Sequence, residues 1–261
     1  MKKIIKNPFT VILKVAVVKL CIVSMFFLFS NIVNAQQSVS WNYPVKPGMD
    51  EWNNLETEQQ RIAVLQVPEE VLEKSSPEEV VGLCITLPSF FIFYAFDTPQ
   101  DGYDILFSRY NIFSHMLSRK DVGSSLIAAY KDADLSGFRT LPYSNEFWTV
   151  KLYYLELLLS QKQILQSLTP NEKFELIKEA RKKFVEKLTN ESFSYLIDLL
   201  FSVRIMASIL YVEQYPEFMV SLKNEAIIPF IETGSVFEDV PPIDEIFRIT
   251  DNYINDNNSQ Q

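Results

Sequence analysis

The chain has 261 residues, 48% of them hydrophobic, and a formal net charge of −9 at pH 7. This length fits one large domain or two small ones, and the negative charge disfavours partners that present phosphates, such as nucleic acids and anionic lipids. A single histidine excludes zinc sites built from several imidazoles, and six glycines without a phosphate-loop or dinucleotide motif disfavour nucleotide cofactors.

The first 35 residues have the pattern of a cleavable secretory signal peptide. Lysines precede an apolar run from Cys21 to Phe29, and small or aliphatic residues occupy positions 33 and 35. A retained membrane anchor is the alternative, but the apolar run is shorter than the roughly 20 residues that span a bilayer. We therefore expect cleavage between Ala35 and Gln36, export to the periplasm or beyond the cell, and no stable membrane insertion afterwards.

After the signal peptide we expect an extended leader over 36–48, a single all-α domain over 49–254 and a disordered tail over 255–261. The leader contains two aromatic residues, Trp41 and Tyr43, which we expect to dock it through their rings. The tail is polar, as is typical of frayed chain ends.

Three helix starts share one pattern, in which a hydroxyl residue precedes a proline at the first helical position and an acid closes the first turn. They are Ser76-Pro77-Glu78-Glu79, Thr98-Pro99-Gln100-Asp101 and Thr169-Pro170-Asn171-Glu172. Besides the helix that follows Thr169 and the one after it, the pattern of apolar residues predicts helices over 50–65, 68–74, 77–87, 99–117, 119–131, 146–165, 216–232 and 242–254.

The helix after Thr169 is predicted to lie at the surface. Its apolar residues Phe174, Ile177, Ala180, Phe184 and Leu188 share one face, and charged residues that include Lys182 and Lys183 cover the remainder. The next helix, over 193–210, is apolar nearly all round, which predicts a central, enclosed helix. Burial of its charged residues Asp198 and Arg204 would force each to find a partner or to shift its pKa, and we expect a structural ion pair rather than catalysis.

The fold class is therefore all-α. The aromatic run over 90–96 fits a buried strand as well as a buried helix, and its helical surroundings favour a helix. The helices form either an irregular bundle or a degenerate stack of helix hairpins of the armadillo, HEAT or TPR kind. No strict sequence period separates these two architectures.

Three segments carry a resemblance to known proteins. They are Ser40-Trp41-Asn42-Tyr43-Pro44-Val45-Lys46-Pro47-Gly48 with Glu51-Trp52 just after, Ala95-Phe96-Asp97-Thr98-Pro99-Gln100-Asp101-Gly102, and Leu117-Ser118-Arg119-Lys120-Asp121-Val122-Gly123. Together they resemble uncharacterised secreted proteins of Gram-negative anaerobic bacteria, which have no assigned activity. The resemblance implies export and transfers no site residue.

One polar pattern suggests a metal site. Asp132, Asp134 and Ser136, followed by Gly137, match the first half of an EF-hand calcium loop. The closing glutamate is missing, because Tyr143 stands at that position. A turn rich in Asp, Ser and Gly at a helix end is the competing interpretation, so no cofactor is expected unless calcium binds here.

Other candidate groups favour structural roles. Cys84, which is the one cysteine after the expected cleavage, is predicted to be a buried structural thiol, and His115 a satisfied, partly buried histidine. Four aromatic residues, Trp41, Tyr43, Trp52 and Trp148, form a candidate sugar-stacking platform, although most of them are expected to be core or docking residues.

No catalytic residue is assigned from the sequence. We expect a non-catalytic, exported helical module that binds another envelope or extracellular protein. Binding of a carbohydrate or another small ligand is the second hypothesis. The third is a small hydrolase that uses two carboxylates, because the sequence contains many acids but singles out no pair.

Overall fold

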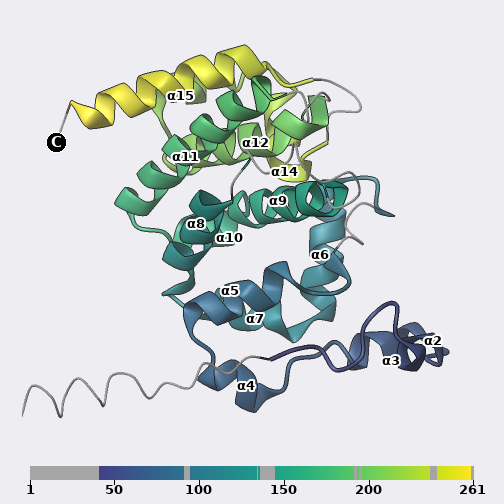
Figure 1. Cartoon of the computed structure of the whole chain (residues 1–261). Helices are drawn as coiled ribbons and strands as arrows, with labels where there is room; N and C mark the ends of the chain where they lie inside the picture. The colour runs from purple at the N-terminus through teal and green to yellow at the C-terminus, as the bar shows by residue number, and fades with distance from the viewer. Residues whose placement is uncertain are drawn as a thin grey trace, which may run out of the picture. The chain divides into compact units, whose positions relative to one another are not determined.

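The structure, a computed structural model, describes residues 41–90, 95–133, 135, 145–190, 193, 196–235 and 240–259, with backbone alone for 145–150 and 196–198. The expected signal peptide and most of the aromatic run over 90–96 lie outside these residues. Within them the chain is helical and contains no strand, which confirms the all-α prediction (Figure 1). A stack of repeated hairpins stays a prediction.

The helices of the described residues belong to the unit that runs from Ser40 to Gln261. They are α2 (Asp50–Asn53), α3 (Glu58–Ala63), α4 (Glu69–Lys74), α5 (Pro77–Ile85), α6 (Pro99–Arg109), α7 (Asn111–Ser118), α8 (Val122–Asp132), α9 (Asn145–Leu159), α10 (Lys162–Ser167), α11 (Pro170–Leu188), α12 (Leu196–Val212), α13 (Pro216–Ser221), α14 (Ile227–Thr233) and α15 (Ile243–Asn258).

The three predicted helix starts are confirmed at the N-termini of α5, α6 and α11. Ser76 and Thr169 each form a reciprocal capping box with the glutamate three residues later. Thr98 accepts a hydrogen bond from the backbone N–H of Asp101, at 3.1 Å. Each cap accepts one free N–H of the first turn, and the proline that follows it has no N–H to satisfy, so the helix start is fixed locally.

Four of the predicted helices are each two helices in the structure. The segments over 50–65, 99–117, 146–165 and 216–232 become α2 with α3, α6 with α7, α9 with α10, and α13 with α14. Apolar spacing alone could not reveal these breaks, because it continues across them. Each break exposes backbone groups that need new partners.

The break between α6 and α7 shows how those partners are supplied. Tyr110 is extended, with φ −119° and ψ 123°. Asn111 exchanges two hydrogen bonds with the backbone of Val67, and Gln66 donates to the carbonyl of Arg109 while accepting from the N–H of Asn111. Two amide side chains thus replace the helical hydrogen bonds that the break removes.

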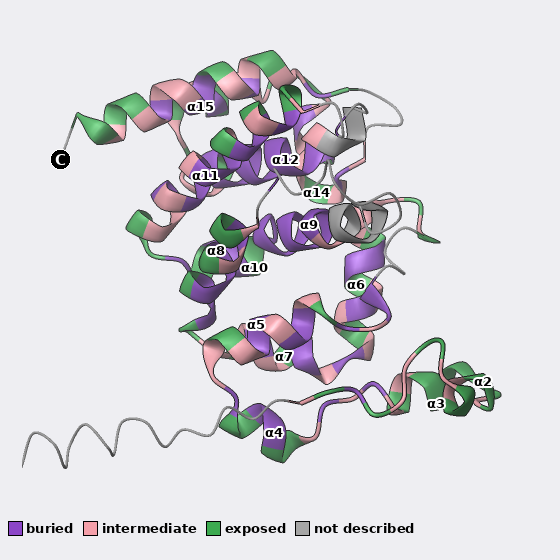
Figure 2. Cartoon of the chain, in the orientation of Figure 1, coloured by how far each residue is buried: buried purple, intermediate pink, exposed green. Residues whose placement is uncertain are grey.

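The predicted central helix is α12. It packs against α9, α10, α11, α14 and α15, and every residue from Leu200 to Leu210 is buried (Figure 2). A second set of contacts joins α5 to α7 and α8. The core therefore surrounds α12, and polar side chains on this helix need partners from its neighbours.

The prediction that α11 is a surface helix is confirmed for its apolar face, where Phe174, Ile177, Ala180 and Phe184 are buried, but its charged side is not fully solvated. Lys183 and Lys187 are 1% and 0% exposed, whereas Leu188, expected on the buried face, is 57% exposed. Lys183 Nζ donates to Ala133 O, and Lys187 Nζ donates to the carboxylate of Glu156. The charged side of α11 is thus partly a core face.

The leader docks through Tyr43 as expected, whereas part of the expected C-terminal tail is helical. Tyr43 is buried and its hydroxyl donates to Leu83 O at 3.4 Å, so this ring docks the leader as expected. Trp41 is half-buried, and its indole N–H has no hydrogen-bond partner among the described residues. At the other end α15 continues to Asn258, so the segment expected to be a disordered tail is helical over its first four residues.

Candidate functional site

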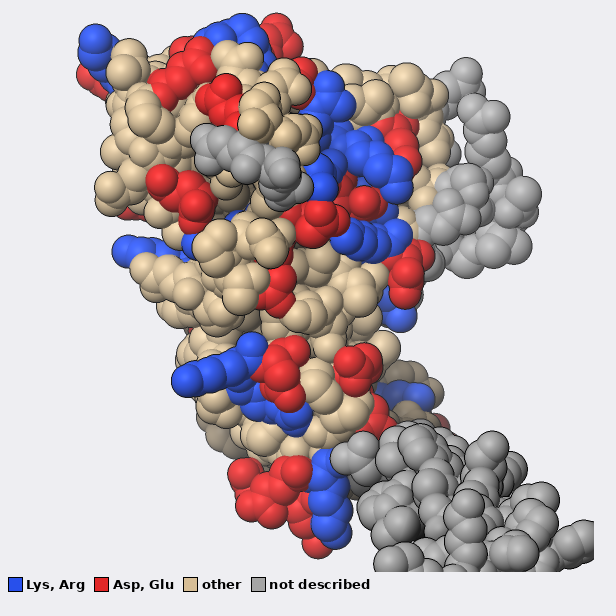
Figure 3. Space-filling view, turned by 90° about the vertical axis from the view of Figure 1, so that its left-hand side faces the viewer, with Lys and Arg blue, Asp and Glu red and all other residues tan. Residues whose placement is uncertain are grey.

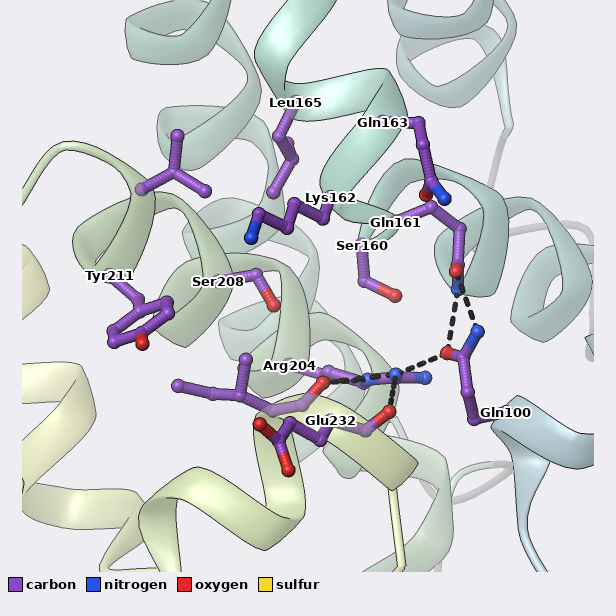
Figure 4. Close-up of a pocket in the computed structure, with 12 residues that line it drawn as sticks. Gln100, Ser160, Gln161, Lys162, Gln163, Leu165, Arg204, Ser208, Tyr211 and Glu232 are labelled. Atoms are coloured by element: carbon purple, nitrogen blue, oxygen red, sulfur yellow. Dashed lines mark hydrogen bonds between the residues drawn. The ribbon is translucent and has the colours of Figure 1, made fainter. Parts of the chain in front are cut away.

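A pocket of about 300 Å³ lies where α6, α10, α12 and α14 meet (Figure 4). Its lining mixes polar and apolar side chains from elements far apart in the sequence. The lining residues are Gln100, Ser160, Gln161, Lys162, Gln163, Leu165, Arg204, Ser208, Tyr211, Val212, Ile231 and Glu232. This volume is at the lower end of the range found for small-molecule sites.

One wall of the pocket is formed by the break between α9 and α10. Gln161 is extended there, with φ −70° and ψ 134°, and its amide donates to the carbonyl of Leu157 at 2.9 Å. The same amide pairs reciprocally with the side chain of Gln100, at 2.9 Å and 3.2 Å. The break therefore brings a buried polar wall against α6.

Arg204 forms part of the lining and is 2% exposed. Its Nε donates to Ile231 O at 3.1 Å, and its Nη2 donates to the carbonyls of Ile231 and Glu232, both at 3.0 Å, and to Gln100 Oε1 at 2.7 Å. The two carbonyls belong to the last turn of α14, where no further helical N–H is available to satisfy them. Arg204 thus caps α14 and joins it to α6.

Gly234 allows this arrangement. It ends α14 in the left-handed conformation, with φ 72°. A Cβ at this position would lie 3.0 Å from Arg204 Nη1 and 3.3 Å from Pro99 Cγ. Glycine is therefore favoured both by the backbone conformation and by the space that the guanidinium occupies.

The expected ion pair of Arg204 does not appear among the described residues. The hydrogen-bond partners of Arg204 are two backbone carbonyls and one amide oxygen, all neutral. Asp198, the other half of the expectation, has its side chain outside the described part of the chain. Burial lowers the pKa of Arg204 to about 10, so the guanidinium stays charged at neutral pH.

Two buried polar atoms at the pocket have no hydrogen-bond partner among the described residues. They are Arg204 Nη1 and the hydroxyl oxygen of Ser208, which is one helical turn further along α12. In Figure 4 the Ser208 hydroxyl points to the side of the pocket where Arg204 lies. Buried polar atoms without partners are uncommon in proteins, and a bound ligand is one way to satisfy them.

The rim of the pocket is exposed and carries charges of both signs. Lys162 and Glu232 lie there, and Tyr211 is 37% exposed. Glu232 is the one acid among the described lining residues, so these residues do not supply the carboxylate pair that the hydrolase hypothesis requires.

A second polar cluster lies in the core and was not predicted. Lys187 Nζ is 2.7 Å from Glu156 Oε2, and both side chains are 0% exposed. Tyr130 and Ser202 donate to the same carboxylate, at 2.7 Å and 2.6 Å. Because water does not reach this pair, it links α8, α9, α11 and α12 rather than forming a ligand site.

The predicted calcium loop is largely outside the described residues. Asp132 is exposed at the end of α8, while Asp134 and Ser136 are not described. In the part of the chain that the structure describes, no group of three or more His, Cys, Asp or Glu is arranged to hold a metal ion. The calcium hypothesis stays a prediction.

The four aromatic residues of the candidate sugar platform do not all present their rings to solvent. Tyr43 is buried, so its ring is unavailable for stacking. Trp52 on α2 contacts Arg61, whose guanidinium carbon is 5.8 Å from the ring centroid. Trp41 is half-buried, and the side chain of Trp148 lies outside the described residues.

Cys84 and His115 occupy structural positions. Cys84 is free, fully buried and directed at Ile112 O, 3.9 Å away, and burial raises the pKa of its thiol. This confirms the prediction of a structural thiol. His115 is half-buried as predicted, but the prediction that its hydrogen bonds are satisfied is wrong for Nε2, which has no partner among the described residues.

Comparisons with protein-family models, with curated proteins and with solved structures find no match to this chain. Within the described residues, none of the helices combines the length and the apolar character needed to cross a membrane.

Proposed function

We propose that this protein binds a small ligand in the pocket between α6, α10, α12 and α14. The observation that carries the proposal is the buried Ser208 hydroxyl, which lines a pocket of about 300 Å³ without a hydrogen-bond partner among the described residues. An unsatisfied buried hydroxyl costs about 1–3 kcal/mol, and a bound ligand that accepts or donates a hydrogen bond there would remove this cost.

The composition of the pocket supports the same proposal. Small-molecule sites are concave, partly apolar and equipped with a few convergent polar groups. Leu165 and Val212 supply apolar surface here, while Arg204 and Ser208 supply polar atoms that are held by α12. The fixed position of these atoms reduces the ordering that binding would otherwise require.

The expected export would place this pocket in the periplasm or outside the cell. Ligand binding of this kind needs no resident cofactor and no catalytic residue. Calcium at Asp132, Asp134 and Ser136 is a separate proposal, and calcium should raise the melting temperature over an EDTA control. An unchanged melting temperature at millimolar calcium would remove it.

The ligand proposal is tested by filling the pocket. The variant Ser208→Leu replaces the unpartnered hydroxyl by a larger apolar side chain, and Ser114→Leu is the matched control on the exposed side of α7. Pools of small acids, amines, sugars and amides are screened by ligand-induced melting shifts of the exported protein. We expect at least one pool to stabilise the wild type and Ser114→Leu but not Ser208→Leu. Equal shifts in all three proteins, or no shift in any, would refute the proposal.

Binding to another protein, which was the first expectation from the sequence, is the second proposal. It is favoured by two neighbouring apolar side chains on α13, Met219 and Val220, which are 38% and 61% exposed. Two such residues are a small surface, and the face shown in Figure 3 mixes basic and acidic side chains rather than presenting one sign. Cross-linked pull-down of the tagged protein from its own envelope and medium tests this proposal, since Val220→Asp should abolish capture of a true partner.

A further inference from the structure

The charges of the pocket differ in sign from the charge of the chain. Lys162 and Arg204 are cationic and Glu232 is anionic, so the lining carries one net positive charge in a protein whose formal net charge is −9. Lys162 has no carboxylate within ion-pair distance among the described residues. The positive charge is thus local to the pocket.

The buried cation makes this local charge significant. Arg204 is bound by neutral oxygens alone among the described residues, and the C-terminal carbonyls of α14 offset its charge in part through the helix dipole. The charge of Asp104 acts on Arg204 as well, but no carboxylate of the described residues contacts the guanidinium. An anion in the pocket would therefore lower the cost of burying this cation. The pocket therefore favours negative ligands over neutral ligands of the same shape.

The remaining lining indicates what else such a ligand contains. The ring of Tyr211 and the side chain of Val212, which are partly exposed, form an apolar wall in front of the fully buried Leu165. An inorganic anion would leave this wall in contact with water, whereas an organic body would cover it. The Ser208 hydroxyl can donate to an anionic oxygen, and such charge-assisted hydrogen bonds are stronger than neutral ones.

We propose that the ligand is a small organic acid, with its carboxylate oriented by the Ser208 hydroxyl beside the Arg204 charge and its apolar body against Tyr211 and Val212. This inference rests on the proposed ligand-binding function and names the chemical class of the ligand. Lys162 at the rim attracts the acid through its long-range charge, so its contribution is screened by salt.

The test compares acids with their own amides, which share the shape and lack the charge. Acetate, butyrate, benzoate and phenylacetate are titrated into the exported protein by calorimetry, each beside its amide, with inorganic phosphate as a further probe. We expect at least one acid to bind about tenfold or more tightly than its amide, because hydrogen bonds to a charged group are the stronger kind. We expect Ser208→Ala to remove most of that preference.

The lysine variants separate local charge from the general charge of the chain. Lys162→Gln should weaken binding of the acid about two- to fivefold at low salt and have no effect at high salt, as for exposed charges in general. Lys223→Gln, an exposed lysine outside the pocket lining, should leave binding unchanged.

The possible failures are distinguishable. If neutral sugars or amides bind as tightly as every acid, and Ser208→Leu abolishes that binding, the acid proposal fails and the ligand-binding function stands. If inorganic phosphate binds more tightly than every organic acid, the organic part of the proposal is overturned. If no probe or pool binds the wild type more tightly than it binds Ser208→Leu, both proposals fail.

Discussion

The buried pair of Lys187 and Glu156 gives a quantitative prediction about stability. Lys187 Nζ lies 2.9 Å and 2.7 Å from the two carboxylate oxygens and 3.0 Å from Ser202 Oγ. The variant Lys187→Met keeps most of the length of the side chain but leaves the carboxylate buried without its cation. Breaking a buried pair in this way costs about 3–5 kcal/mol. Because Tyr130 and Ser202 still donate to the carboxylate, we expect about 3 kcal/mol.

The loss is measured by urea unfolding followed by circular dichroism, with Lys182→Met as the matched control. Lys182 is on the same helix and its side chain is 59% exposed, so its replacement should change the free energy of unfolding by no more than about 0.5 kcal/mol. The double variant Lys187→Met with Glu156→Leu should recover part of the loss, because it leaves no unpaired charge. Equal stability of Lys187→Met and Lys182→Met would refute the inference that this pair joins the helices.

Three further predictions concern local features. Thr169→Ala removes the cap of α11 and should lower the free energy of unfolding by about 1 kcal/mol in the same urea assay. Asn111→Ala removes two hydrogen bonds between a helix break and the backbone, and it should speed hydrogen exchange at the N–H of Val67, which now lacks its acceptor. Hydrogen bonds from Asn252, which has the larger effect, and from Arg248 hold the pKa of Glu217 below its ordinary value. Glu217 thus adds stability at neutral pH that is lost as the pH falls through this lowered pKa, and Glu217→Gln should match the wild type in acid-induced unfolding at the lowest pH.

Helix starts were predictable because the interactions that stabilise them lie within a few residues of each start. A hydroxyl, a proline and an acid within four residues satisfy the first N–H groups without help from the rest of the fold. The starts at Ser76, Thr98 and Thr169 could therefore be placed to the residue. The enclosed character of α12 was also readable, since a helix that is apolar all round has no face for water.

Two of the four helix breaks, those between α6 and α7 and between α9 and α10, were not predictable in the same way, because their partners come from distant segments. Tyr110 ends α6 in an extended conformation that is stabilised by Gln66 and Asn111, and Gln66 lies 45 residues from Asn111. Gln161 likewise depends on Gln100, 61 residues earlier. The apolar period continues across both breaks, so a pattern analysis joins the flanking helices.

The missed break between α9 and α10 and the missed pocket have the same cause. In a continuous helix over 146–165, Gln161 would not be extended. Its side-chain amide would then not pair with Gln100 or line the pocket. Arg204 was visible in the sequence as a charge in an apolar helix, and it was correctly expected to be constrained by burial. Its partners could not be inferred, because a C-terminal turn of α14 supplies carbonyls that no sequence motif marks.

A charged residue in an apolar run was a better guide to the interior than helical periodicity. Glu156 follows Leu152-Tyr153-Tyr154-Leu155 and precedes three leucines, and it is fully buried with a cation from α11. On α11 the same reasoning fails, because Lys183 and Lys187 lie among other charged residues and look solvated. The lysines are buried because α8, α9 and α12 cover that side of the helix, which only the tertiary arrangement determines. A lone acid among leucines thus points to a buried cation even where the cation itself is hidden in a charged sequence.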